Sequence, residues 1–182
     1  MTTITPERAG TSRASFYRAA QKGEIERIAR GIYITPDAPA ADYDQIEAAT
    51  RRADATICLT SALAQHDLID TIPARLHIAI PSRSRTPATA GAIQWHQFDR
   101  ATFDLGRETI SIEGTELTIG RYSAERSIAD AFRLRGEIGY EIARDALKEW
   151  LRRGGKPAAM LELAEAMPRA KRPMLTALEL LS

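Results

Sequence analysis

The stretch TPERAGTSRASFYRAAQKGEIERIARGIYI, residues 5–34, decides the fold of the N-terminal part of the chain. Thr5 suits the N-cap of a short first helix, and Gly10 ends that helix after little more than one turn. Ser12 is a good N-cap for a second helix that follows at once, and Gly23 suits the left-handed residue past its end. The pattern therefore predicts two short helices joined by a tight turn.

The residues after the second helix have the pattern of a hairpin. Apolar and polar side chains alternate through residues 25–34 around Ala29-Arg30-Gly31, and glycine in such a loop is typical of a bulged hairpin. Arg30 would then lie at the hairpin tip. Two helices, a tight turn and a two-stranded hairpin are the layout of a winged helix-turn-helix, a DNA-binding fold. We expect this domain over residues 1–37.

One face of the second helix carries side chains that suit the major groove of DNA. Arg13, Tyr17 and Gln21 recur at helical spacing, with further basic residues beside them. The arginines of the hairpin would hold the DNA backbone. The full set of expected DNA-binding residues is Arg13, Ser15, Tyr17, Arg18, Lys22, Arg27 and Arg30.

Basic side chains are concentrated at this end of the chain. Residues 1–36 hold six lysines and arginines against three acidic residues, and the remainder holds 19 against 21. Because lysine and arginine release counterions when they contact DNA phosphates, a local surplus supports the DNA-binding interpretation. The alternative is a small helical hairpin whose arginines are simply solvated.

The chain as a whole has the composition of an ordinary soluble protein. Its 182 residues are 44% hydrophobic, and its net charge of +1 gives no overall attraction to nucleic acid or membranes. The single cysteine, Cys58, excludes an internal disulfide, and its apolar neighbours predict that it is buried and unreactive. Because we find neither a signal peptide nor a long apolar segment, we expect a cytoplasmic protein that makes no membrane contact.

A linker with two prolines, residues 35–41, follows the hairpin, and we place a domain boundary between residues 37 and 38. After the linker, strand patterns come mostly first and helical periods later. This order predicts an α+β fold, in which a mixed sheet-and-helix C-terminal domain over residues 38–182 follows the winged helix-turn-helix. Strands are expected near residues 56–59, 76–80, 93–96, 109–112 and 116–119, and helices after Asp42 and near residues 60–66, 123–134, 140–153, 157–167 and 173–181.

Four segments carry a resemblance to a known family. They are GEIERIARGIY (residues 23–33), LTSALAQH (residues 59–66), LHIAIP (residues 76–81) and RSIAD (residues 126–130). In this order and spacing they resemble the AbiEi family of bacterial type IV antitoxins over nearly the whole chain. The resemblance implies a winged helix that binds operator repeats and represses its own operon. It also implies a larger C-terminal domain that counteracts a cognate nucleotidyltransferase-like toxin.

Residue types that often serve in enzymes form no recognisable motif in this chain. Cys58, His66, His77 and His96 lack the short spacing of a zinc site. His77 fits a core histidine in an apolar strand, and His66 near a helix end can meet exposed carbonyls. The expected strands carry almost no carboxylate besides Glu116, which disfavours a metal-dependent nuclease. We expect no enzymatic activity, no metal and no cofactor.

Three arginines of the C-terminal part are candidates for contacting a protein partner. Arg83 and Arg85 alternate with hydroxyl side chains just past an expected strand, where guanidinium groups can bind phosphates or carboxylates. A solvated loop is the alternative. Arg126 completes the set, although it can also pair with Asp130 one helical turn later.

These observations predict an antitoxin that binds operator DNA with its N-terminal domain and counteracts a toxin with its C-terminal domain. One alternative is a stand-alone winged-helix transcriptional regulator. The other is a regulator whose C-terminal domain is nuclease-like. A nucleotidyltransferase-like gene directly downstream would favour the antitoxin, and an isolated gene would favour a regulator.

Overall fold

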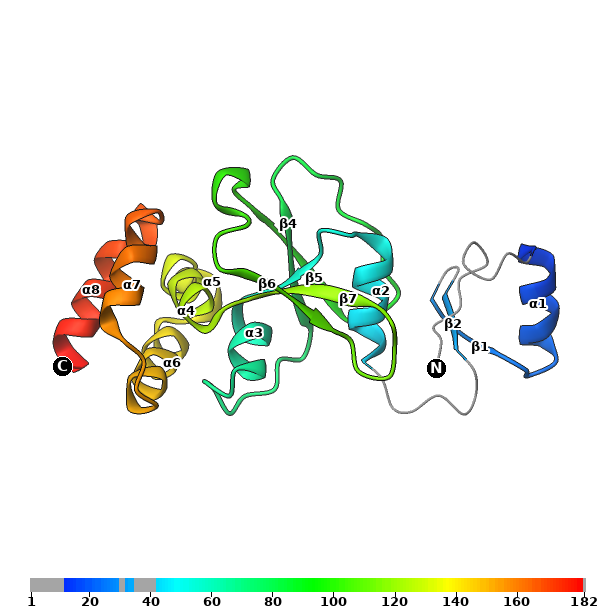
Figure 1. Ribbon diagram of the computed structural model, residues 1–182, viewed down its shortest axis with the longest axis horizontal. Helices are drawn as coiled ribbons and strands as arrows, with labels where there is room; N and C mark the ends of the chain where they lie inside the picture. The colour runs from blue at the N-terminus through cyan, green and yellow to red at the C-terminus, as the bar shows by residue number, and fades with distance from the viewer. Residues whose placement is uncertain (1–11, 30–31, 35–41, 182) are drawn as a thin grey trace.

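A computed structural model describes residues 12–29, 32–34 and 42–181 (Figure 1). The first described helix, α1 (Arg13–Gln21), begins where the sequence predicts, because the Ser12 hydroxyl accepts a hydrogen bond from the Ser15 N–H at 3.3 Å. Gly23 has a φ of +74°, which confirms the left-handed residue after the helix. The short helix expected at residues 5–10 lies outside the described residues.

The expected hairpin is present as strands β1 (Glu26–Ala29) and β2 (Ile32–Ile34). The two strands are antiparallel, with Arg27 opposite Tyr33, and the register shifts between Arg27 and Ala29 as in a bulge. The tip residue, Arg30, lies outside the described residues. The described helix and hairpin confirm the winged-helix arrangement for this part of the chain.

A small aromatic contact joins the helix to the hairpin. Phe16 of α1 and Tyr33 of β2 are 6% and 7% exposed, and their ring centroids lie 5.2 Å apart. Because Phe16 is drawn into this contact, the next residue, Tyr17, points to solvent and is 60% exposed. The contact therefore decides which face of α1 is free.

A five-stranded mixed sheet forms the centre of residues 42–181. The strand order is β5-β4-β3-β7-β6. Strand β3 is antiparallel to β4 and parallel to β7, β4 is parallel to β5, and β6 is antiparallel to β7. The bounds are β3 (Thr56–Ile57), β4 (Leu76–Pro81), β5 (Ile93–Phe98), β6 (Arg107–Ser111) and β7 (Thr118–Tyr122).

Two helices from the first half of this region pack against the sheet. Asp42 caps α2 (Tyr43–Arg51), as expected, and α2 places Ile46 in a buried cluster with Ile57 of β3. Helix α3 (Leu59–Gln65) buries Leu63 in a second cluster formed mainly by the C-terminal helices. Helix α3 therefore connects the sheet to the helical layer.

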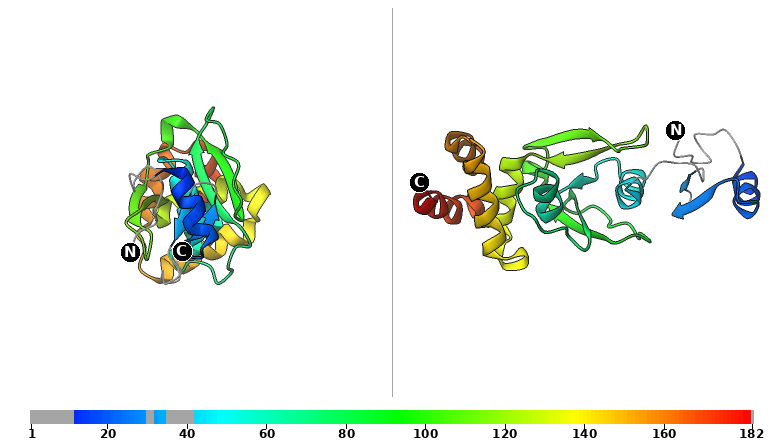
Figure 2. Two further views of the ribbon diagram at one scale, coloured as in Figure 1. Left: turned by 90° about the vertical axis from the view of Figure 1, so that its right-hand side faces the viewer. Right: turned by 90° about the horizontal axis from the view of Figure 1, so that it is seen from below.

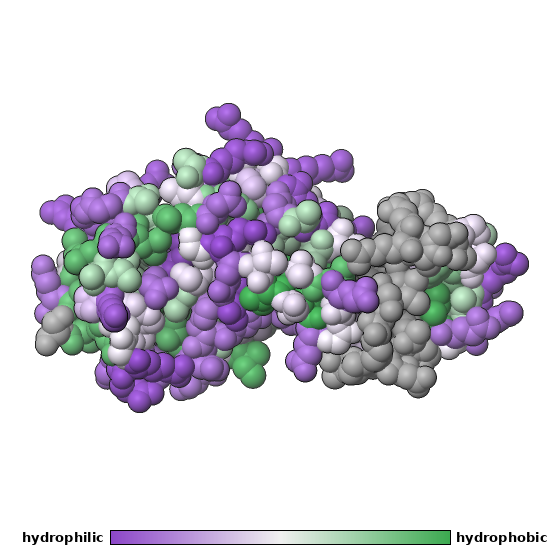
Figure 3. All heavy atoms as spheres, viewed as in Figure 1, coloured by the Kyte–Doolittle hydropathy of each residue, from purple (hydrophilic) through white to green (hydrophobic). Residues whose placement is uncertain are grey.

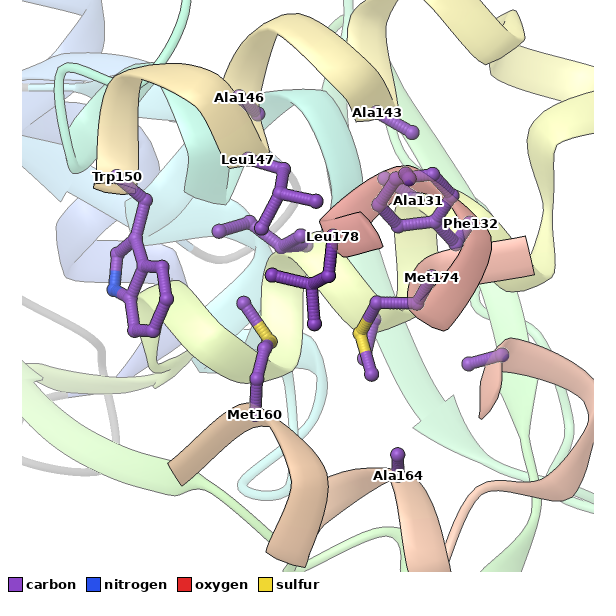
Figure 4. Close-up of a cluster of buried hydrophobic side chains, with 14 of the residues drawn as sticks. Ala131, Phe132, Ala143, Ala146, Leu147, Trp150, Met160, Ala164, Met174 and Leu178 are labelled. Carbon is purple, nitrogen blue, oxygen red and sulfur yellow. The ribbon is translucent and has the colours of Figure 1, made fainter. Parts of the chain in front are cut away.

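The last third of the chain forms helices that gather at one end of the sheet (Figures 1 and 2). Residues from several of these helices, with Leu63 and Leu68, share one buried apolar cluster, which includes Phe132, Leu147 and Met174 (Figure 4). This separation of sheet and helices confirms the α+β class. The helices are α4 (Ala124–Arg133), α5 (Arg135–Ile138), α6 (Tyr140–Arg152), α7 (Pro157–Glu165) and α8 (Pro168–Leu181).

Helix α8 corrects one boundary predicted from the sequence. The sequence predicts helices near residues 157–167 and 173–181, but α8 already begins at Pro168 and contains Pro173 in its interior. Proline is tolerated in the first turn because the N–H it lacks has no intrahelical partner there. Burial of Ala170, Met174 and Ala177 then offsets the hydrogen bond lost at Pro173.

Candidate nucleic-acid interface

The face of α1 opposite Phe16 presents a row of exposed polar side chains. Tyr17, Arg18 and Lys22 are all exposed. Arg13 is the first residue of the helix, and Ser15 lies in its first turn. In a winged helix-turn-helix, the N-terminal residues of such a helix reach the base edges.

The basic groups on this face are only weakly held by the protein. Arg18 Nε lies 3.4 Å from the Ala14 carbonyl oxygen, and Arg18 Nη2 lies 3.5 Å from Ser15 Oγ, both at the long limit for hydrogen bonds. Lys22 and Glu24 are exposed and 4.0 Å apart, so their ion pair is weak. The Arg18 guanidinium and the Lys22 ammonium can therefore turn toward a ligand at little cost.

The hairpin supplies a second set of basic residues. Arg27 is exposed on β1, opposite Tyr33. The structure thus places Arg18 on α1 and Arg27 on the hairpin, which the Phe16–Tyr33 contact holds together, and Lys22 directly after α1. Arg30, expected beside them, falls outside the described residues, and so does the first helix of the motif.

The N-terminal part of the chain is similar to a known protein family. Residues 4–36 match the family model described as transcriptional regulator, AbiEi antitoxin. This N-terminal segment is therefore similar to the AbiEi antitoxins. The match includes α1 and the whole hairpin, so the exposed basic face lies inside the AbiEi segment. A search of curated proteins finds no match.

Downstream of the AbiEi segment, Arg83 and Arg85 lie in the connection between β4 and β5. Both are exposed, and neither guanidinium makes a hydrogen bond or ion pair with the described part of the chain. The backbone near them is braced, because Arg83 N–H donates to Gln97 Oε1 at 3.0 Å and Gln97 Nε2 donates to the Ser84 carbonyl at 3.3 Å. Arg83 also adopts a φ of +65°. The structure therefore presents two free guanidinium groups on a braced loop.

Arg126 requires a correction, because its side chain is 1% exposed. Its Nε donates to Asp130 Oδ2 at 2.8 Å, and its Nη1 donates to the carbonyls of Thr102 and Leu105 at 2.5 and 2.7 Å. A buried guanidinium held in this way supports the fold and cannot form part of an exposed partner-binding surface. The pairing with Asp130, weighed from the sequence as the alternative, is the one observed.

The sequence did not single out Arg133, which shares Asp130 with Arg126. Arg133 Nε donates to Asp130 Oδ1 at 2.9 Å, and its guanidinium lies over the Phe98 ring with Cζ 4.5 Å from the centroid. The sequence could have indicated that Arg133 pairs with Asp130, because Arg126, Asp130 and Arg133 recur at helical spacing in a segment that is otherwise apolar on that face.

Cys58 is buried, as the sequence indicates, whereas His77 is only half-buried and is not a core histidine. Cys58 is fully buried, and burial raises the pKa of its thiol well above the ordinary value. His66 Nε2 lies 2.8 Å from the Tyr122 carbonyl oxygen, and His77 Nδ1 lies 2.9 Å from His96 Nε2 in a stacked pair. Within the described ranges, no three or more His, Cys, Asp or Glu side chains gather as a metal site would require.

The molecular surface is mainly hydrophilic on the face seen in Figure 3, with hydrophobic residues visible among the C-terminal helices. No helix in the described ranges combines the length and the apolar composition needed to cross a bilayer.

Proposed function

We propose that the protein represses its own operon by binding operator DNA with α1 and the hairpin, and that its C-terminal region counteracts a nucleotidyltransferase-like toxin. The observation that carries the proposal is the exposed basic face of α1 within a segment of the AbiEi antitoxin family. An antitoxin or regulator role follows from the family, whereas the operator, the toxin and the division at residues 37 and 38 are parts of the proposal.

DNA binding is tested by gel shifts of the protein's own promoter. Arg13→Ala and Arg18→Ala should relax discrimination between operator and unrelated DNA, because an arginine that contacts base edges contributes about 1–3 kcal/mol of specificity. Arg30→Ala should weaken binding to all sequences alike and lower the salt dependence, as expected for a phosphate contact. Arg172→Ala is the matched control, since Arg172 is an exposed arginine on α8. Normal shifts by all three N-terminal variants would contradict the proposed interface.

Counteraction of the toxin is tested by co-expressing the protein with the product of the neighbouring gene and measuring growth. Charge reversal at Arg83 and Arg85 should abolish rescue, because both guanidinium groups are exposed and free to bind an acidic or phosphate-bearing surface. The melting temperature should stay unchanged, because exposed loop charges contribute little to stability. Rescue that survives both reversals would remove this loop from the interface. If the product of the neighbouring gene is not toxic, the alternative of a stand-alone transcriptional regulator is favoured.

A further inference from the structure

A cavity with an unusual charge distribution lies between the sheet and the C-terminal helices. Its volume is about 270 Å³. One wall is formed by Asp99 and Thr102, which follow β5, and the opposite wall by the junction of α7 and α8, including Met167 and Arg169. Arg126 and Arg133 of α4 also line it. None of these residues belongs to the proposed DNA or toxin contacts.

The two α4 arginines share a single carboxylate. Asp130 is fully buried and accepts hydrogen bonds from both guanidinium groups. The nearby Cys58 thiol and Tyr122 hydroxyl are neutral, because burial raises the pKa of each. Arg126, Asp130 and Arg133 together therefore carry a net charge of +1, with Arg126 and Asp130 buried and Arg133 partly exposed, and such a charge favours an anion beside it.

Some N–H groups of these two guanidinium groups make no hydrogen bond to the described residues. Arg126 Nη2 and both terminal nitrogens of Arg133 donate no hydrogen bond within the described chain. Arg133 Nη2 is buried and lies 2.8 Å from Asp130 Oδ1 without hydrogen-bond geometry. Because buried donors are normally satisfied, this Arg133 nitrogen beside the cavity points to an acceptor supplied by a ligand or by solvent.

The two guanidinium groups are held rigidly in place. Arg126 Cζ lies 4.4 Å from the centroid of the Tyr122 ring, Arg133 Cζ lies 4.5 Å from that of Phe98, and the two rings stack on each other. Arginines fixed on aromatic faces keep their N–H groups in one orientation, which lowers the entropic cost of binding. The start of α8 adds the positive end of a helix dipole.

We propose that this cavity binds the phosphate group of a small ligand, with Arg126 and Arg133 at its base and Arg169 at its rim. Three arginines face two carboxylates there, Asp130 and Asp99, and Asp99 is exposed and already accepts a hydrogen bond from the Ala101 N–H at 3.0 Å. Planar guanidinium groups bind phosphate oxygens through paired, charge-assisted hydrogen bonds. The volume is slightly below that of typical drug-sized pockets, which suits a compact ligand. The bound phosphate would join the loop after β5 to the α7–α8 junction. The proposal stands apart from the DNA-binding and toxin functions.

The test measures binding of inorganic phosphate to the full-length protein by calorimetry and thermal shift, with sodium chloride at equal ionic strength as the reference. Phosphate should release or absorb heat with a stoichiometry of one and raise the melting temperature with concentration. Hydrogen exchange should slow near residues 99–102 and 166–169 on binding. Ribose 5-phosphate is the second probe: tighter binding than inorganic phosphate identifies a phosphorylated metabolite as the ligand, and weaker or equal binding identifies free phosphate.

Two variants and two controls make the test specific. Arg133→Gln and Arg169→Gln should each weaken phosphate binding about tenfold or more, since each removes a charge-assisted contact. Arg169 is exposed, so its variant folds normally even if Arg133→Gln does not. Arg172→Gln on the same helix and Arg144→Gln on α6 should bind as the wild type does. No heat and no thermal shift with the wild type would overturn the proposal, and so would equal losses in Arg169→Gln and Arg172→Gln.

Discussion

At the scale of single residues, the stability of the interior depends on Asp130, which accepts hydrogen bonds from both Arg126 and Arg133. The carboxylate is fully buried, as is almost all of Arg126, and the two form an ion pair at 2.8 Å within α4. A buried pair is strongly destabilising to break, because the partner that remains is an unpaired charge away from water. The pair therefore matters more for stability than the many exposed ion pairs of α6.

Asp130→Asn is expected to destabilise the fold by about 3–5 kcal/mol, because it leaves the buried Arg126 guanidinium without a counterion. Urea unfolding followed by circular dichroism measures this change. Asp145→Asn is the control, since Asp145 pairs with Arg144 on the exposed surface of α6 and its loss should have little effect. Equal midpoints for the two variants would show that the buried pair contributes no more than a surface pair.

The stacked histidines His77 and His96 make stability depend on pH. The pKa of His96 is lowered to about 4 by burial, by His77 and by Arg133, and burial also lowers the pKa of His77. Between pH 6.5 and pH 4 the unfolded chain therefore binds more protons than the folded chain, and acidification through this range destabilises the fold. The contribution of the pair is fully present above pH 6.5 and falls below it.

His96→Gln should reduce this acid sensitivity, because glutamine fills a similar volume and does not titrate. The measurement is the melting temperature of both proteins at a series of pH values between about 7 and 4, the range set by the ordinary and shifted pKa values. The two curves should converge toward low pH. Parallel curves over the whole range would show that the pair does not control this dependence.

At the scale of elements, a buried carboxylate of α2 holds the long connection between β4 and β5. Glu47 is 2% exposed, and its oxygens accept hydrogen bonds from the N–H groups of Ala90 and Gly91 at 2.9–3.1 Å. Arg51 pairs with the same carboxylate at 3.4 Å. A helix that the sequence presents as simply amphipathic thus anchors the loop that carries Arg83 and Arg85.

Glu47→Ala should lower the free energy of unfolding by about 1–3 kcal/mol, because the hydrogen bonds from the Ala90 and Gly91 N–H groups to a charged, buried carboxylate are lost. Hydrogen exchange at Ala90 and Gly91 should become faster, while exchange in β3 follows only the global change in stability. Glu162→Ala on α7 is the matched control, because Glu162 is exposed. Unchanged exchange at both amides would contradict the anchoring role.

At the scale of the whole molecule, the buried clusters predict that residues 40–182 fold without the N-terminal module. The apolar clusters of the sheet and of the C-terminal helices are made of residues from Ile46 onward. A fragment starting at Ala40 should therefore show cooperative unfolding. It should rescue cells from the toxin and fail to repress the promoter. Rescue that requires residues 1–35 would refute the proposed division of roles.

Much of the fold was predictable because local signals there agree with tertiary packing. Ser12 and Asp42 cap the helices that the sequence places after them, and Gly23 has the predicted left-handed conformation. The start of α8 was not predictable in the same way. A proline is compatible both with the first position of a helix and with the residue just outside it. Only the packing of Ala170 and Met174 shows that Pro168 is the first residue of α8.

The same distinction between local signals and tertiary packing applies to the candidate site. The sequence by itself determined the capped helix, the hairpin and their basic composition, because caps, turn residues and periodicity act between neighbours in the chain. Only the tertiary structure decided that Arg126 is buried while Arg83 and Arg85 are exposed. It alone brings Asp99 and Arg169 to one cavity around Arg126. Charge and spacing along the chain are the same whether a side chain faces water or the core, and that choice depends on contacts between distant segments.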